Sequence, residues 1–212
     1  MFAINHAATA LIIKKAFPGV AIPWILLSVQ LVEFIWVFLN LLGVERTRTK
    51  NTVTYVGDIS LEHMPYSHSV VSMAGIAILS WFIIAEGFNN PELALAFSLG
   101  VMSHLVLDLI THAKDIQLAP LVPEPRFGLG LYANFPLRAF FLEIGYGFLC
   151  WWIYRGGWIL LAVIVVFNLA NISMFSRRIS GLEKMMANRP KLIAAVILIQ
   201  IVVTLTLVGL FS

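Results

Sequence analysis

Residues 91–112 read PELALAFSLGVMSHLVLDLITH, an apolar stretch as long as a helix needs to cross the hydrocarbon core of a bilayer. Into this stretch the chain places three side chains that are costly in a membrane, His104, Asp108 and His112. They recur every four residues and therefore share one face of a helix. The stretch predicts a membrane-spanning helix that carries a polar site.

The rest of the chain has a similar composition. Of its 212 residues, 60% are hydrophobic and 12% are charged, whereas soluble domains have about 45–50% apolar and about 25% charged residues. This composition excludes a soluble globule, a disordered tail and a disulfide scaffold, and it leaves no basic surface for a nucleic acid. The single cysteine, Cys150, lies in an apolar run and cannot form an intrachain disulfide.

Apolar stretches of about 20 residues with few charges predict the membrane spans. Six stretches qualify, at about 20–43, 66–88, 91–112, 136–155, 157–176 and 191–211, and residues 1–17 form a seventh, shorter candidate. The predicted fold is an all-α, polytopic bundle of six to seven transmembrane helices in a single domain, residues 1–212. Because Lys14 and Lys15 follow the first apolar stretch instead of preceding it, that stretch is not expected to be a cleaved signal peptide.

The basic residues predict the orientation of the chain. Eleven of the 14 Lys and Arg residues fall in three loops, 44–65, 113–138 and 177–191. Short loops rich in Lys and Arg face the cytoplasm, so we expect a multi-pass protein of the cell (inner) membrane with a cytoplasmic N-terminus. The C-terminus is then outside if all seven helices span.

Histidines and acids inside apolar spans are candidates for a functional site. All five histidines precede residue 113, in or at the ends of these spans. At 1.5 Å per residue, several of these polar groups lie in one layer, roughly 3 to 11 Å from the cytoplasmic side, with Glu33 deeper. The candidate metal ligands are His6, Glu33, His63, His68, His104, Asp108 and His112.

A set of three or more convergent histidines and carboxylates favours zinc, or manganese or iron, over calcium. His63 and His68 flank Pro65, which interrupts or starts a helix, so both can still point at a common centre. A lone histidine at a helix end is more often simply hydrogen-bonded, and a lone Glu33 or Glu143 can be a protonated acid bonded to a neighbouring helix. The joint occurrence at one depth favours the metal site.

Further polar residues border the same layer. Asp115 and Glu143 are candidates for a general base or for orienting a ligand histidine. Lys114, Arg126 and Arg138 are candidates for binding an anionic headgroup, or they serve only as determinants of topology. The Pro- and Gly-rich loop 119–136 is a candidate lid.

Four motifs, in order, resemble those of the membrane-bound metal-dependent hydrolases, the LexA-binding inner-membrane-associated family. They are Asn5-His6, the acidic Glu33, HMPYSHS at 63–69 and SHLVLDLIT at 103–111. The resemblance covers about residues 1–145, including GLGLYAN at 128–134 and Glu143, whereas residues 146–212 carry no motif. At the position of Glu33 the family pattern leads us to expect an aspartate.

The resemblance implies a distant similarity to zinc-dependent phospholipase C and therefore a phosphoester-cleaving centre with one or more zinc ions. His68, His104 and Asp108 would hold one ion, and His6, Glu33 or His63 a second. Such an ion lowers the pKa of bound water to about 7. The function expected is hydrolysis of a phosphoester or ester of a lipid or lipid-linked substrate near the cytoplasmic leaflet.

Two other classes of protein fit parts of the pattern. Intramembrane acids and histidines also serve ion- or proton-coupled transporters, in which Glu33 would be the essential group. Against a transporter, the sequence shows no internal repeat and no pair of broken helices in corresponding halves. A haem protein would use two of His6, His68 and His104 as axial ligands.

Overall fold

The computed structural model describes residues 1–179, 181 and 185–212, and this part of the chain is mostly helical. Its helices are α1 (Ala3–Ala16), α2 (Ile22–Leu41), α3 (Val70–Gly87), α4 (Pro91–Thr111), α5 (Leu131–Asn134), α6 (Pro136–Tyr154), α7 (Trp158–Ala170), α8 (Ile172–Phe175) and α9 (Pro190–Phe211), with a 3-10 turn η1 (Val56–Asp58). The strands are β1 (Arg46–Thr49), β2 (Ile59–His63), β3 (Ile116–Ala119) and β4 (Val122–Phe127). The expected all-α class is thus confirmed in its main feature.

Four helices in the described residues, α2, α3, α4 and α9, are long and apolar enough to cross a membrane. The structure does not show six to seven such spans. Helices α1 and α7 have 14 and 13 residues, fewer than the roughly 20 that a span needs. The expected span 157–176 is interrupted, because α7 ends at Ala170 and α8 follows after Asn171.

Local sequence explains where the long helices begin. Proline stands in the first turn of α2, α4, α6 and α9, where its missing N–H costs nothing and its fixed φ favours the helix. The Asn90 side chain caps α4 by accepting a hydrogen bond from the Leu93 N–H (3.0 Å), and Ser69 caps α3 in the same way through Ser72.

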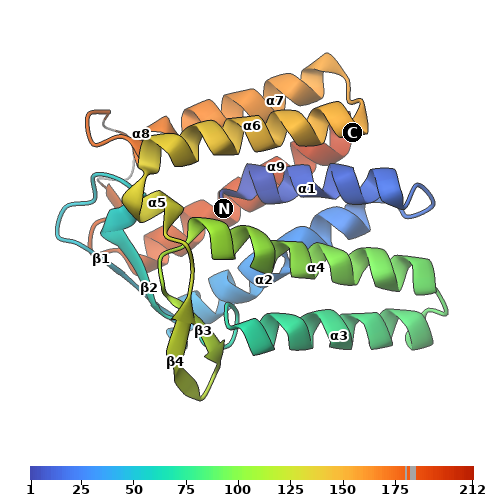
Figure 1. The fold of residues 1–212 in the computed structure, drawn as a ribbon, viewed down its shortest axis with the longest axis horizontal. Coiled ribbons are helices and arrows are strands. Elements are labelled where there is room, and N and C mark those ends of the chain that lie inside the picture. The colour runs from blue at the N-terminus through green and yellow to red at the C-terminus, as the bar shows by residue number, and fades with distance from the viewer. Residues whose placement is uncertain (180, 182–184) are drawn as a thin grey trace.

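The helices form a bundle in which α4 and α1 occupy central places (Figure 1). Helix α4 packs against α2 on one side and α3 on the other, and α1 packs against α6, α2 and α9. The apolar side chains between them include Ile4 and Leu11 of α1, Val29 of α2 and Leu160 of α7, all essentially inaccessible to solvent. Helices α1, α2 and α4, which carry His6, Glu33 and His104, thus pack against one another.

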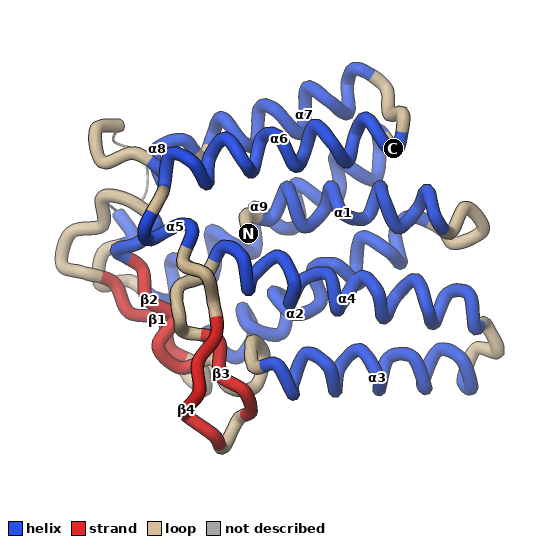
Figure 2. Tube along the Cα trace, in the orientation of Figure 1, coloured by secondary structure: helices blue, strands red, loops and turns tan. Residues whose placement is uncertain are grey.

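Two of the three basic loops, 44–65 and 113–138, are not irregular. Each of these two contains a two-stranded antiparallel hairpin, β1–β2 and β3–β4 respectively. Figure 2 shows both hairpins in red at the same end of the bundle. The described residues between α8 and α9 (176–179, 181 and 185–189) lie at this end as well, and the α1–α2, α3–α4 and α6–α7 connections lie at the other (Figure 1). The described parts of the three basic loops thus gather at one end, here called the hairpin end.

Candidate metal centre

Helix α4 supplies the middle of a buried polar cluster. The carboxylate of Asp108 is completely inaccessible, and its Oδ2 atom lies 3.2 Å from Nε2 of His104, one turn earlier on the helix. Its other oxygen, Oδ1, lies 3.7 Å from Nε2 of His112, one turn later. The predicted common face of these three side chains is confirmed.

Two neighbouring elements bring further ligands to Asp108 and His104. His68, just before α3, places its Nε2 atom 3.6 Å from Asp108 Oδ2. Glu33, near the middle of α2, lies with Oε1 3.8 Å from His68 Nε2 and 3.9 Å from His104 Nε2. Residues distant in sequence thus converge on one point.

Helix α1 closes the cluster from the other side. The imidazole of His6 stacks on that of His104, with ring centroids 3.9 Å apart, and its Nε2 atom lies 3.4 Å from Asp108 Oδ1. The α-amine of Met1 donates to Asp108 Oδ1 (2.6 Å) and to Thr111 Oγ1 (3.0 Å). We call His6, Glu33, His68, His104 and Asp108 the central cluster.

The central cluster has the donors that a metal ion requires. His6, His104 and Asp108 form one group whose ligand atoms lie within 4.8 Å of one another, and Glu33, His68 and His104 form a second. The Nε2 atoms of the three histidines and Oδ2 of Asp108 are buried without a hydrogen-bond partner, which is costly unless another group satisfies them. Tetrahedral zinc at Zn–N distances of about 2.0–2.1 Å separates its ligands by about 3.3 Å, close to the distances found here.

The second ring nitrogen of His104 explains why its Nε2 atom faces inward, whereas Nδ1 of His6 is buried without a hydrogen-bond partner. Nδ1 of His104 lies 3.0 Å from the carbonyl oxygen of Val29. A carbonyl only accepts hydrogen bonds, so Nδ1 carries the proton and Nε2 offers its lone pair. Such a partner behind a ligand histidine is the usual arrangement at metal sites.

His63 is not brought to the central cluster. It ends strand β2, its side chain is exposed, and it pairs with Arg46 of β1. His112 caps α4 at the edge of the central cluster, where its Nδ1 atom faces Asp115 Oδ1 at 3.4 Å. Of the seven expected ligands, five form the central cluster, His112 borders it and His63 lies apart.

Glu143 belongs to a different buried network. The amide of Asn5 and the hydroxyl of Tyr132 both donate to its carboxylate, and the same Asn5 amide donates to Asn168 at 2.9 Å. This network joins α1, α6 and α7 next to His6. The structure thus gives Glu143 hydrogen-bond partners in place of an open position.

Glycine makes the position of Tyr132 possible. Gly128 has φ +138°, and a Cβ there would lie 2.0 Å from the carbonyl oxygen of Ala113, so the chain can return against the end of α4 only without a side chain. Gly130 N–H then donates to the His112 carbonyl oxygen. The short helix α5 begins directly afterwards and carries Tyr132 to Glu143.

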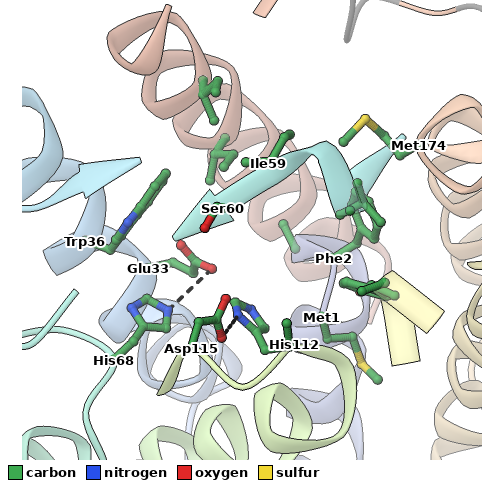
Figure 3. A pocket seen from close by; sticks show the side chains of 18 of the residues that line it. Met1, Phe2, Glu33, Trp36, Ile59, Ser60, His68, His112, Asp115 and Met174 are labelled. Atoms are coloured by element: carbon green, nitrogen blue, oxygen red, sulfur yellow. Dashed lines mark ion pairs between the residues drawn. The ribbon is translucent and has the colours of Figure 1, made fainter. Parts of the chain in front are cut away.

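A cavity of about 410 Å³ opens beside the central cluster. Figure 3 shows Glu33 and His68 on one part of its wall, Asp115 and His112 next to them, and Trp36, Ile59 and Met174 farther around. Lys114 and Arg126 also line the cavity, and α9 contributes an apolar wall. Arg138 is not among the lining residues, and its guanidinium lies over the ring of Phe135.

One loop at the rim is held by an ion pair. Val56 and Gly57 line the cavity, and the next residue, Asp58, accepts hydrogen bonds from Lys50 Nζ (2.6 Å) and from the Thr54 amide and hydroxyl. Burial acts to raise the pKa of Asp58, but these hydrogen bonds and the Lys50 charge outweigh burial and hold it below its ordinary value. Asp58 is therefore ionised at neutral pH, and its ion pair with Lys50 holds the rim in place.

Sequence reasoning missed the groups that orient the ligands. Three such groups are the Val29 carbonyl at His104, the Ser67 hydroxyl 2.7 Å from His68 Nδ1, and the Glu45 carboxylate that accepts from this hydroxyl. They carry no signal in the sequence, because backbone acceptors and loop residues follow no periodic pattern. Glu45 lies in the loop 44–65, where the sequence singles out only the basic residues and His63, yet its side chain is almost inaccessible. The sequence predicts buried acids only within the apolar spans.

The fold and the site define a helical membrane protein with a buried histidine–carboxylate cluster that can hold a metal ion. A family model described as YdjM inner membrane protein matches residues 8–180, and the chain belongs to this family. The match includes Glu33, His68, His104 and Asp108 and begins two residues after His6. No curated protein and no solved structure matches the chain.

Proposed function

We propose that this protein is a metal-dependent membrane hydrolase that cleaves a phosphoester or ester bond of a lipid or lipid-linked substrate. One observation carries the proposal. Three buried imidazoles direct unpartnered Nε2 atoms at two carboxylates, and the group adjoins a cavity large enough for part of a small ligand. A cluster built only for stability would pair these atoms with each other or with backbone groups.

The donor set favours zinc, with manganese or iron as alternatives. His6, Glu33, His68, His104 and Asp108 would hold the metal. When bound, such an ion supplies Lewis acidity and a nucleophilic water at neutral pH.

Asp115 is the better placed of the two candidate bases. It lines the cavity, and His112 lies 3.4 Å from its Oδ1 atom, so the pair can hold and pass on a proton at the cavity wall. Glu143 is already bound by Asn5 and Tyr132 and does not line the cavity. We therefore assign Asp115 to proton transfer and Glu143 to positioning α1.

The cavity suits an amphiphilic substrate with an anionic headgroup. Lys114 and Arg126 add positive charge close to Asp115, and basic side chains bind phosphate oxygens strongly. Ile193, Ile197 and Ile201 of α9 form an apolar part of the cavity wall that matches an acyl chain. Arg138, which lies outside the cavity, serves topology in this proposal.

We further infer that the hairpin end faces the cytoplasm, because it holds the three loops rich in Lys and Arg. In this arrangement helices α1, α6 and α7 complete a bundle of six to seven membrane segments together with the four candidate spans. The site then lies near the cytoplasmic leaflet, where a headgroup can reach it.

Metal analysis of the purified protein tests the metal centre. We expect about one or more equivalents of zinc, manganese or iron per chain in the wild type. Asp108→Ala and His104→Ala are each expected to lose it while remaining inserted and folded, because they remove a donor and not an apolar packing contact. His63→Ala is the matched control, since this histidine is exposed and apart, and it is expected to keep the metal.

Full metal content in both variants would overturn the proposal. For the reaction itself, a panel of phospholipids and lipid-linked phosphates is incubated with the protein with and without a chelator, and chelator-sensitive cleavage is expected. Ion or proton flux in proteoliposomes, from protein with no stoichiometric metal, would instead support the transporter.

A further inference from the structure

Glu45 is a buried carboxylate outside the central cluster and outside every helix. It follows the turn after α2 and directly precedes β1, and its side chain is nearly inaccessible to solvent. Its Oε1 atom accepts the backbone N–H groups of Tyr66 (2.8 Å) and Ser67 (2.9 Å), and its Oε2 atom accepts the Ser67 hydroxyl (2.5 Å). One carboxylate thus organises the turn that leads into His68.

The direction of the next hydrogen bond follows from proton counting. A hydroxyl has one proton, and Ser67 gives its own to Glu45. The contact of 2.7 Å between Ser67 Oγ and His68 Nδ1 therefore has the imidazole as donor. With the proton on Nδ1, the lone pair of His68 is on Nε2, the atom that faces Glu33 and Asp108.

We propose that Glu45 is a positioning residue that acts through Ser67 to fix the tautomer and the ring orientation of His68. The proposal rests on the proposed function only where it concerns metal binding, because the tautomer is a property of the protein without a metal. The Ser67 hydroxyl can either donate to His68 Nδ1 or accept from it. Because Glu45 takes the hydroxyl proton, Ser67 can only accept from His68. His104 needs no such residue, since the Val29 carbonyl already decides its tautomer.

Two variants change this chain of hydrogen bonds in different ways. In Glu45→Gln the amide oxygen can still accept the two backbone N–H groups, but the amide nitrogen donates to Ser67 Oγ. The hydroxyl then donates to His68 Nδ1, and the proton of His68 is expected to move to Nε2. Ser67→Ala removes the hydroxyl alone and leaves the backbone contacts of Glu45 in place, so a mixture of tautomers is expected.

Ser103→Ala is the matched control. Ser103 precedes His104 as Ser67 precedes His68, but its hydroxyl donates to the Gly100 carbonyl (2.7 Å). Its removal is expected to leave both imidazoles unchanged.

The tautomers are measured by nitrogen-15 NMR of labelled histidine in the metal-free protein in detergent, at a pH where the imidazoles are neutral. We expect His68 to be protonated at Nδ1 in the wild type and in Ser103→Ala, at Nε2 in Glu45→Gln, and in both forms in Ser67→Ala. A residue that only stabilised the loop would change the melting temperature and leave the tautomer alone.

Titration with Zn²⁺ then measures the consequence for binding. Loss of a hydrogen-bond partner behind a ligand costs about 10- to 100-fold in metal affinity, and we expect weakening in this range for Glu45→Gln and less for Ser67→Ala. An unchanged His68 tautomer in both variants would overturn the inference. Changed tautomers in a protein that binds no metal would uphold the inference and refute the proposed function.

Discussion

Asp108 uses its two oxygens for two different sets of partners. Oδ1 faces His6 and His112, and Oδ2 faces His68 and His104. A carboxylate of this kind can contact two neighbouring groups of ligands at once, one through each oxygen. A histidine with one free nitrogen can contact only one. At the scale of the residue, the chemistry therefore depends on which atom of each side chain is left unpaired, and for His68 and His104 the hydrogen bond behind the ring decides that.

Glu143 provides a prediction at this scale. Glu143→Ala leaves the Asn5 amide and the Tyr132 hydroxyl without their acceptor in a buried place, and each unsatisfied group costs about 1–3 kcal/mol. We expect a clear fall in the thermal unfolding midpoint in detergent. Glu143→Gln keeps an acceptor oxygen, so its unfolding midpoint is expected to fall less than that of Glu143→Ala.

Metal content separates this role from direct ligation. Because Glu143 is not part of the central cluster, both variants are expected to retain the metal. Loss of metal at an unchanged unfolding midpoint would show that Glu143 is a ligand and not a positioning residue.

Close helix packing brings the ligands of different elements together. At Gly100 of α4, an added Cβ would lie 1.9 Å from Oγ and 2.8 Å from Cβ of Ser28 on α2. Small residues at such crossings let membrane helices approach closely. The approach places the Val29 carbonyl against His104 and sets Glu33, one turn farther along α2, beside the same imidazole.

Gly100→Ala tests the importance of this crossing. The added methyl group must push α2 away from α4, and overpacking of this kind costs about 1–3 kcal/mol. We expect lower thermal stability together with weaker metal binding, because Val29 and Glu33 move with α2.

Gly75→Ala is the matched control on α3, where an added Cβ meets nothing within 4 Å. This variant is expected to keep both the stability and the metal affinity of the wild type. Equal thermal stability and equal metal affinity in Gly100→Ala and Gly75→Ala would refute the argument from packing.

At the scale of the whole molecule, the basic loops and the cavity beside the metal centre lie at the same end of the bundle. The described parts of the basic loops, the two hairpins and the cavity-lining residues Lys114 and Arg126 all belong to the hairpin end. This arrangement lets one set of basic residues orient the protein and attract an anionic headgroup.

Cysteine labelling tests the orientation. Leu121, in the turn between β3 and β4, and Phe88, between α3 and α4, are 90% and 69% exposed, and the native Cys150 is fully buried. We expect a membrane-impermeant maleimide to label Phe88→Cys from outside intact cells and Leu121→Cys only in inverted vesicles. Labelling of both positions from the same side would contradict the proposed topology.

The sequence was sufficient for properties that depend on neighbours along one helix. The apolar stretches predicted all the long helices, and the four-residue spacing predicted that His104, Asp108 and His112 share a face, because helical geometry alone relates positions along a single helix. The length of a span was less predictable, since residues 157–176 stay apolar through the break at Asn171.

Only the tertiary structure decided which groups meet across elements. His63 and His68 are equally plausible in the sequence, but pairing with β1 holds His63 at the exposed end of β2, while Glu45 and Ser67 turn His68 inward. The sequence by itself determined a membrane bundle with scarce polar residues inside it. The structure decided which of these residues form a centre, because convergence depends on packing and hydrogen bonds between segments far apart in the chain.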